Sequence, residues 1–306
     1  MAIPRDPGGS PRPGSPRKTV ALATCARLPD LAPDERAVIA PLAERGITAV
    51  PVVWDEPSVA WESFDAVVVR STWDYSWRHE EFLRWARSVP NLCNPADVLA
   101  WNTDKHRYLR DLADAGLPVV PTVWVESGST VTLPSQGVHV VKPAVGSGAR
   151  HTGRYDLGDP RERALAAGLA ANLTASGRTV MVQPYLDAVD TAGESALLFF
   201  GGRYSHAVRK SALLRGPADH GADVLAAESI VARDATDAEL HLAQRVLCAV
   251  PGGIRRLLYA RVDLLPGADG TPVVLELELA EPSLFLGRTQ QAAERFAAAI
   301  AARLDG

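Results

Sequence analysis

Three acidic residues near the C-terminus have the spacing of a metal site. The segment LLYARVDLLPGADGTPVVLELELAEPS predicts a hairpin centred on Asp269-Gly270. Symmetric pairing about this turn places Asp263 opposite Glu276. It also places Arg261 opposite Glu278 on the same face, because strand side chains repeat every two residues. Opposed like charges roughly 5 Å apart repel one another, so we expect a compensating cation, and carboxylate oxygens suit Mg2+ shared with phosphates. The alternative is the solvated face of an exposed hairpin.

A glycine-rich loop follows a lysine that ends an apolar strand. In VVKPAVGSGARHTG, Lys142 precedes Gly146, Ser147 and Gly148. Glycines let backbone N–H groups approach phosphate oxygens, and a lysine supplies charge without directional demands. The segment matches neither GxxxxGK[ST] nor GxGxxG, so it does not indicate a P-loop or a dinucleotide site. A plain surface loop is the alternative.

Polar residues also end the buried strand in VVVRSTWDY. Three valines are followed by Arg70, Ser71, Thr72 and Asp74. Arg70 suits a carboxylate, whereas Asp74 and the two hydroxyls suit an amine or another polar group. Because ligands bind at the carboxyl ends of strands in open α/β sheets, we expect these residues to bind substrate. The alternative is a capped loop with Trp73 packed on the core.

The elements that must position these residues alternate in an α/β pattern. The runs TVALAT, ITAVPVVW and FDAVVVRS predict strands, and DERAVIAPLAERG predicts a helix between the first two. A capped helix follows in TDKHRYLRDLADAG, and ESALLFFGGRYSHAVRK predicts a hairpin that turns at Gly201-Gly202. Residues 1–17 are rich in Pro and Gly and predict a disordered tail.

The order of these motifs resembles the ATP-grasp superfamily of carboxylate–amine ligases. Lys105, the Lys142 strand with its glycine loop, the strand end Gln183-Pro184-Tyr185-Leu186, an Arg/Lys pair and Asp…Glu-x-Glu follow one another between about Asn94 and Ser283. The resemblance implies an α/β fold with an N-terminal open α/β substrate domain at 18–100. A central lobe at 101–187 and a C-terminal lobe at 188–306 would clamp ATP.

The resemblance also implies a role for each motif residue. ATP would contact Lys105, Lys142, Gly146, Ser147, Gly148, Gln183, Tyr185, Leu186 and Asp190. Mg2+ would be bound by Asp263, Glu276 and Glu278. The transferring phosphate would face Arg209, Lys210 and Arg261. Many members of the superfamily have Asn at the last metal position, where this sequence has Glu278.

The implied reaction is activation of a carboxylate by ATP to an acyl phosphate, which an amine then attacks. More narrowly, VVVRSTWDYSWRHEEFLRWA, the GES…SHAVRK segment and LELELAEPSLFL look like the O-ureido-serine cyclo-ligase group of cycloserine biosynthesis. In that group, ring closure of O-ureido-D-serine yields D-cycloserine. A ligase that joins two separate amino acids and a non-catalytic nucleotide-binding regulatory module are the alternatives.

Composition sets the broad class of the protein. The chain has 306 residues, 47% of them apolar and 22% charged, with a net charge of −4, which predicts a globular protein whose partner is a small amino-acid-like molecule rather than nucleic acid. Three widely spaced cysteines favour the reducing cytoplasm. No secretory signal or 18-residue apolar run is present, so no membrane association is expected. The sequence is compatible with a homo-oligomer as well as with a monomer.

Overall fold

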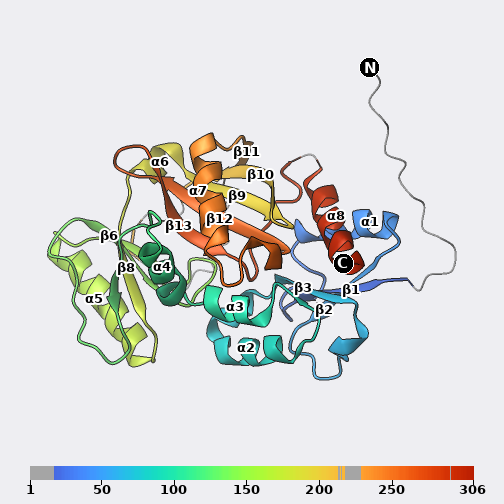
Figure 1. Ribbon diagram of the computed structural model, residues 1–306. Helices are drawn as coiled ribbons and strands as arrows, with labels where there is room; N and C mark the ends of the chain where they lie inside the picture. Colours follow the sequence, from blue (N-terminus) through green and yellow to red (C-terminus); the bar gives the residue numbers. More distant parts are fainter. Residues whose placement is uncertain (1–16, 213, 215, 218–228, 290) are drawn as a thin grey trace, which may run out of the picture.

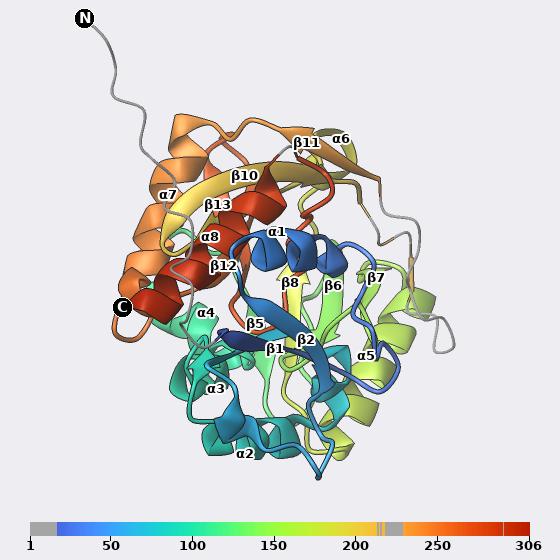
Figure 2. The ribbon, with the colours of Figure 1, turned by 90° about the vertical axis from the view of Figure 1, so that its right-hand side faces the viewer.

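The computed structural model describes residues 17–212, 214, 216–217, 229–289 and 291–306. The predicted tail, apart from Arg17, lies outside these ranges. Three sheets organise the described residues, and Figures 1 and 2 show them as neighbouring units. No helix within these ranges combines the length and apolar composition needed to span a bilayer.

The N-terminal domain is an open parallel sheet with strand order β2-β1-β3-β4. Its central strands come from the apolar runs TVALAT and AVVVRS, which are almost entirely buried, as expected when both faces of a parallel sheet are covered. The strands are β1 (Thr19–Thr24), β2 (Thr48–Val53), β3 (Ala66–Ser71) and β4 (Leu92–Cys93). The covering helices are α1 (Ile39–Glu44), α2 (His79–Ser88) and α3 (Ala96–Asn102), with the 3-10 turns η1 (Glu35–Val38) and η3 (Trp73–Trp77).

The central lobe is an antiparallel sheet with strand order β5-β8-β6-β7. Helix α5 covers it, and that helix begins where the Asp159 side chain accepts hydrogen bonds from two backbone N–H groups. The strands are β5 (Val123–Val125), β6 (Val138–Pro143), β7 (Gly153–Asp156) and β8 (Val180–Pro184). The helices are α4 (Lys105–Asp114) and α5 (Pro160–Ala175).

The C-terminal lobe holds a five-stranded sheet with order β11-β10-β9-β12-β13. The strands are β9 (Glu194–Phe200), β10 (Arg203–Lys210), β11 (Ile230–Arg233), β12 (Tyr259–Pro266) and β13 (Pro272–Glu278). The helices are α6 (Ala188–Ala192), α7 (Asp237–Cys248) and α8 (Ala292–Asp305). In α8, Phe296 packs in one core with Leu22 of β1 and Phe200 of β9. Figures 1 and 2 show α8 beside α1, so the last helix joins this lobe to the N-terminal domain.

The hairpin of β12 and β13 has the register expected from its sequence. Asp263 pairs with Glu276, and Arg261 pairs with Glu278. Nearer the turn the register shifts, so that Leu264 pairs with Val274. The expected cross-strand arrangement of the acids is therefore confirmed, and the bulge lies between the acids and the turn.

Side chains from neighbouring helices satisfy the outer edge of β13. The Asn102 amide donates to the carbonyl of Leu277 and accepts from the N–H of Leu279, at 2.8 and 2.6 Å. The Tyr108 hydroxyl accepts from the N–H of Leu277. Nearer the turn, Val274 bonds to the backbone of the segment that precedes β5. Helices α3 and α4 therefore hold this strand in place.

Candidate active site

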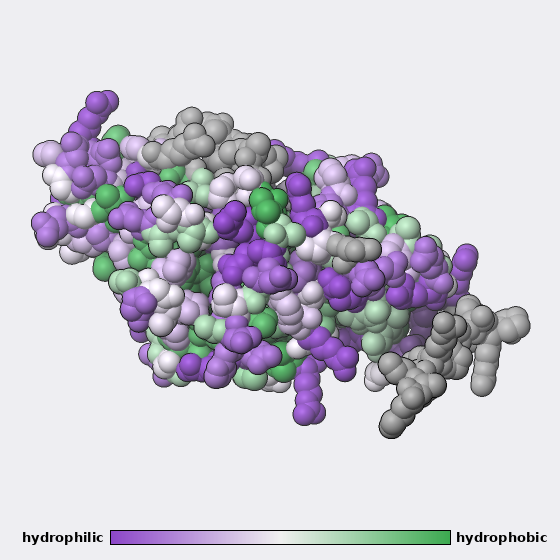
Figure 3. All heavy atoms as spheres, turned by 90° about the horizontal axis from the view of Figure 1, so that it is seen from above, coloured by the Kyte–Doolittle hydropathy of each residue, from purple (hydrophilic) through white to green (hydrophobic). Residues whose placement is uncertain are grey.

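A cavity of about 560 Å³ opens where the N-terminal domain, the central lobe and the C-terminal lobe meet. Its wall includes residues from η3, from the glycine loop, from the end of β8 and from the β12–β13 hairpin. The face of the molecule in Figure 3 is mostly hydrophilic, with apolar residues in small separate groups. The cavity, which collects charged side chains from three units, is the place where chemistry would occur.

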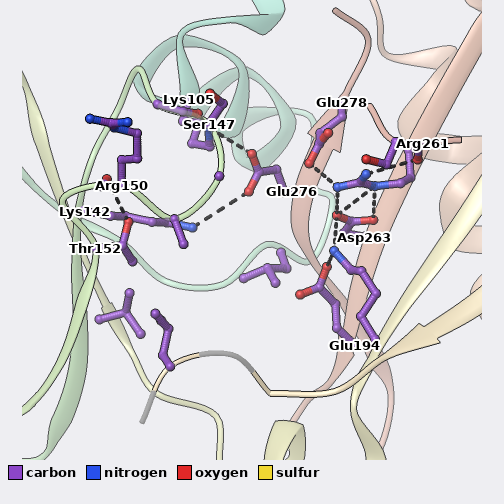
Figure 4. Close-up of a pocket in the computed structure, with 18 of the residues that line it drawn as sticks. Lys105, Lys142, Ser147, Arg150, Thr152, Glu194, Arg261, Asp263, Glu276 and Glu278 are labelled. Atoms are coloured by element: carbon purple, nitrogen blue, oxygen red, sulfur yellow. Dashed lines mark hydrogen bonds and ion pairs between the residues drawn. The ribbon is translucent and has the colours of Figure 1, made fainter. Parts of the chain in front are cut away.

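Two lysines meet Glu276 on one side of the cavity (Figure 4). The Nζ atom of Lys105 lies 2.9 Å from the Glu276 carboxylate and 2.9 Å from the carbonyl oxygen of Gly146. The Nζ atom of Lys142 lies 3.9 Å from the other carboxylate oxygen. Helix α4 positions Lys105 as its first residue, and the end of β6 positions Lys142. The structure therefore brings together both predicted phosphate-binding lysines.

The pKa values of the two lysines shift in opposite directions. Burial alone would lower the pKa of Lys105, but the nearby Glu276 carboxylate outweighs it and the pKa is raised. Burial prevails for the more distant Lys142, whose pKa is lowered. Burial raises the pKa of Glu276, but the two lysines outweigh it and the pKa is lowered. These three groups therefore form one electrostatically coupled cluster.

A second cluster surrounds Asp263 on the opposite side of the cavity (Figure 4). The Arg261 guanidinium donates to both carboxylate oxygens of Asp263, at 2.9 Å each, and also to Glu278. The Nζ atom of Lys210 lies 3.0 Å from Asp263 and also contacts Glu194. Burial, opposed by the adjacent cations, raises the pKa of Glu278 to about 7 and that of Glu194 to about 8. Burial also acts on Asp263, but Arg261 and Lys210 outweigh it and lower its pKa.

The carboxylates of Asp263, Glu276 and Glu278 are the type of ligand that binds a hard cation, but in this structure each is paired with a lysine or arginine. Among the described residues no three acidic, histidine or cysteine side chains form a ready-made metal cluster. Asp263, Glu276 and Glu278 nevertheless line one cavity and offer the oxygen donors that Mg2+ prefers. These carboxylates could hold the ion once phosphate oxygens replace them as partners of the lysines. The predicted donor set therefore fits, on the condition that the ion pairs exchange.

The glycine loop rests against the N-terminal domain. The Ser147 hydroxyl donates to the carbonyl oxygen of Trp73 at 3.0 Å and to the Ser76 hydroxyl at 3.3 Å. The Arg150 guanidinium lies 4.7 Å above the ring of Trp77. Gly146, Ser147 and Gly148 all line the cavity, as expected for a loop over phosphates. The loop is thus held against η3 of the N-terminal domain.

The end of β8 forms another part of the cavity wall. Gln183, Tyr185 and Leu186 line the cavity, as predicted for an adenine site. The Tyr185 hydroxyl donates to Asp190 at 2.6 Å, and the guanidinium of Arg154 lies 3.8 Å above the Tyr185 ring. Asp190 is not among the lining residues, so it reaches the cavity only through Tyr185.

The polar run after β3 departs from its expected role. Arg70 is 1% exposed, lies 3.3 Å from Glu35 and 4.5 Å above the Tyr259 ring, and donates to the carbonyl of Pro282. This arginine thus clamps the segment after β13 onto the N-terminal domain and does not line the cavity.

The hydroxyl residues next to Arg70 are buried as well. Ser71 accepts a hydrogen bond from the N–H of Ala32, and Thr72 is fully buried. Asp74 does line the cavity, but its carboxylate accepts hydrogen bonds from Trp54 and Arg78 at 2.9 and 3.3 Å. The placement of Arg70, Ser71 and Thr72 does not support direct substrate binding, and that of Asp74 supports it only weakly.

A register shift in the β9–β10 hairpin moves Arg209 away from the position that symmetric pairing predicts for it. Symmetric pairing about Gly201-Gly202 would place Arg209 opposite Glu194. A bulge between Tyr204 and His206 shifts the register by one, so that Lys210 pairs with Glu194 instead. Arg209 is exposed and absent from the cavity wall, whereas Lys210 lines it. The placement of Arg209 therefore does not support the predicted catalytic role.

Sequence reasoning missed four charged residues of the cavity wall, which are Arg27, Arg150, Glu194 and Glu281. Glu194 pairs with Lys210 because of the bulge between Tyr204 and His206, which no glycine or proline marks in the sequence. Arg27 follows the end of β1, the position at which ligands bind in open α/β sheets. Glu281 follows β13, and its place in the LELELAEPS segment gave no periodic signal that distinguished it.

Comparison with known proteins places these features in a family. Residues 20–94 match the family model described as D-cycloserine synthetase DcsG, N-terminal domain. The chain is 40% identical over 276 residues to the cycloserine biosynthesis protein DcsG of Streptomyces lavendulae, covering 85% of this chain and 90% of that protein. The crystal structure of D-cycloserine synthetase DcsG superposes with a TM-score of 0.82 at 37% identity and covers 94% of this chain and 99% of that one.

More distant structures share the fold. ATP-grasp ligase PsnB complexed with minimal precursor, Mg and ADP has a TM-score of 0.59 at 20% identity, over 94% of this chain and 98% of its own. D-alanine–D-alanine ligase from Bacillus anthracis, complexed with ATP, has a TM-score of 0.63 at 14% identity, over 94% and 97%. The predicted α/β fold of the ATP-grasp type is thereby confirmed. The chain belongs to the DcsG family.

Proposed function

We propose that this protein is an ATP- and Mg2+-dependent ligase that closes O-ureido-D-serine into D-cycloserine. The observation that carries the proposal is the cavity between three units, where Lys105 and Lys142 face one carboxylate and Arg261 and Lys210 face others. Such preorganised positive charge suits a reaction that moves a phosphoryl group. The similarity to DcsG, which is named for cycloserine biosynthesis, supports the product, and the resemblance to the O-ureido-serine cyclo-ligase group suggests the substrate.

In this proposal the residues on the two sides of the cavity have different tasks. Lys105 and Lys142 bind the phosphates of the nucleotide, with the glycine loop closed over them. Arg261 and Lys210 stabilise the charge that develops as the substrate carboxylate attacks the terminal phosphate, which gives an acyl phosphate and ADP. The substrate's oxygen-bound ureido nitrogen then attacks the acyl carbon, phosphate leaves, and the ring closes. Hydrolysis of the carbamoyl group that this nitrogen still carries releases carbon dioxide and ammonia and leaves D-cycloserine.

The metal donors proposed for this site are Asp263, Glu276 and Glu278. Mg2+ held there would neutralise phosphate oxygens during transfer.

The three cysteines carry free thiols, which agrees with a reaction in the reducing cytoplasm.

ADP release tests the proposal directly. Purified protein is incubated with Mg-ATP and O-ureido-D-serine, and the product is identified by mass spectrometry. We expect ADP together with cycloserine, and loss of both in the Lys142→Met variant. ADP formed only with pairs of amino acids would move the substrate assignment to a peptide-forming ligase. Absence of ADP with either type of substrate would overturn the proposed function.

A further inference from the structure

Glu281 is a cavity-lining acid to which the proposed reaction gives no task. It lies three residues beyond the end of β13 and is 8% exposed. Two residues of η3 meet it, because the Tyr75 hydroxyl is its side-chain partner and the Trp73 indole N–H donates to its carbonyl oxygen. Glu281 therefore lies where the metal-donor strand meets the N-terminal domain.

Glu281 differs from the other acids of the cavity in having no countercharge. Each of those acids is ion-paired: Asp74 with Arg78, Glu194 with Lys210, Asp263 with Arg261, Glu276 with Lys105 and Glu278 with Arg261. Within the described ranges, Glu281 makes no ion pair at all, and its partner Tyr75 is neutral. A buried carboxylate without a cation is costly, so a cationic ligand group would be bound favourably there.

The protonation of Glu281 agrees with this absence of a partner. Burial, together with the nearby Glu278 carboxylate, raises the pKa of Glu281 to about 8, and the more distant charge of Lys105 only partly opposes them. A positively charged ligand group placed against this carboxyl would remove the penalty of ionising it.

The neighbourhood of Glu281 also suits the two charges of an amino acid. The Nη1 atom of Arg261 donates at 3.2 Å to the carbonyl of Ser283, two residues beyond Glu281. Arg261, a cation for a carboxylate that exchanges with Asp263 or Glu278, is thus bonded to the short segment that carries Glu281, an anion for an ammonium group. Asp74, the acid expected to take the amine, is already occupied by Trp54 and Arg78.

We propose that Glu281 binds the ammonium group of the amino-acid substrate and so makes the site specific for substrates that carry one. The proposal rests on the proposed function, since it concerns the substrate of that same reaction. Arg261 then lies at the carboxylate that is activated, and Glu281 lies at the amino group on the neighbouring carbon. Glu281 makes no contact with the nucleotide in this arrangement.

The test combines a variant with a substrate analogue. Glu281→Gln and the wild type are each assayed for ADP release with O-ureido-D-serine and with 3-(ureidooxy)propanoate, which lacks only the amino group. For wild type, loss of the amino group should lower kcat/KM about 10- to 100-fold, the range for a hydrogen bond to a charged group. Glu281→Gln should lose a similar factor with O-ureido-D-serine, mainly through KM. It should lose almost nothing further with the analogue.

Controls separate this role from others. The KM for ATP and the Mg2+ dependence should change less than about twofold in Glu281→Gln, whereas Glu281→Asp should recover part of the discrimination. Glu294→Gln, a substitution of the same type at a partly exposed residue outside the cavity wall, should match wild type.

Two results would overturn the assignment. One is a Glu281→Gln enzyme that discriminates against the analogue as strongly as wild type does. The other is a defect confined to Mg2+ or ATP, which would place Glu281 at the metal. Failure of the proposed function looks different, because wild type itself would then release no ADP with O-ureido-D-serine. In that case the same comparison is made with an amino acid that does support ADP release and with its deamino analogue.

Discussion

Replacing Glu276 with Gln tests the ion pairs at the nucleotide side of the cavity. Glu276 lies 2.9 Å from Lys105 and 3.9 Å from Lys142. Breaking a buried pair by removing one partner costs about 3–5 kcal/mol of unfolding free energy. Lys105 keeps its hydrogen bond to the carbonyl of Gly146, and the Glu276 side chain is 21% exposed. We therefore expect a smaller loss, about 2–3 kcal/mol, in the ligand-free protein.

Nucleotide binding should change in opposite directions with and without Mg2+. Without the metal, ATP must displace Glu276 from both lysines, and the negative charge of Glu276 repels the ATP phosphates. Glu276→Gln should therefore bind metal-free ATP about tenfold more tightly than wild type, equivalent to about 1.4 kcal/mol. With Mg2+ present, the variant has lost a donor, so Mg-ATP should bind more weakly and turnover should fall at least about 100-fold.

Calorimetry and ADP release measure these effects, and urea unfolding measures the stability. ATP is titrated into each protein first with EDTA and then with excess Mg2+, with Glu294→Gln as the matched control. Full turnover in Glu276→Gln would show that Glu276 is not a metal donor. Weaker binding of metal-free ATP than in wild type would refute the exchange of ion pairs.

Three further predictions concern other charged groups. Arg70→Met should cost about 3–5 kcal/mol in urea unfolding because it leaves Glu35 buried and unpaired, and the Glu35→Leu/Arg70→Met double variant should recover much of this loss; an equal loss in both would contradict the clamp. Arg209→Ala should keep kcat/KM for ADP release within about twofold, because the side chain is exposed away from the cavity, and a loss beyond tenfold would return Arg209 to the catalytic group. The ligand-free protein should lose stability as pH rises between 4.5 and about 8. The cause is that folding raises the pKa of Glu194 and Glu281, so the folded state binds more protons than the unfolded state and the slope is negative, about 1–2 kcal/mol per pH unit. Urea unfolding across this range should show the decline, and a flat or rising curve would contradict it.

The metal hairpin could be predicted because its determinants are local. The Asp269-Gly270 turn and the period-two pattern fix which residues oppose one another, and the bulge falls on the turn side of the acids. The lysines and the glycine loop could be placed through the order of motifs. These features depend on short stretches of chain and on their sequence order.

The roles of Arg70 and Arg209 could not be read from local sequence. Arg70 meets Glu35 and the carbonyl of Pro282, partners that only the tertiary fold brings together. Arg209 moved off the cavity because of a single bulge with no glycine or proline to mark it. A polar residue at a strand end therefore shows where a ligand could bind, but it does not show whether another part of the protein already occupies that residue.

The closed outer edge of β13 has a consequence for association between molecules. An edge strand with free N–H and C=O groups can pair with a strand of another chain and begin aggregation. Here Asn102 and Tyr108 occupy the outward-facing groups of Leu277 and Leu279 that they contact. The strand that carries two proposed metal donors is thereby protected from pairing with a strand of another molecule. The protein can therefore place these donors on an edge strand without promoting aggregation.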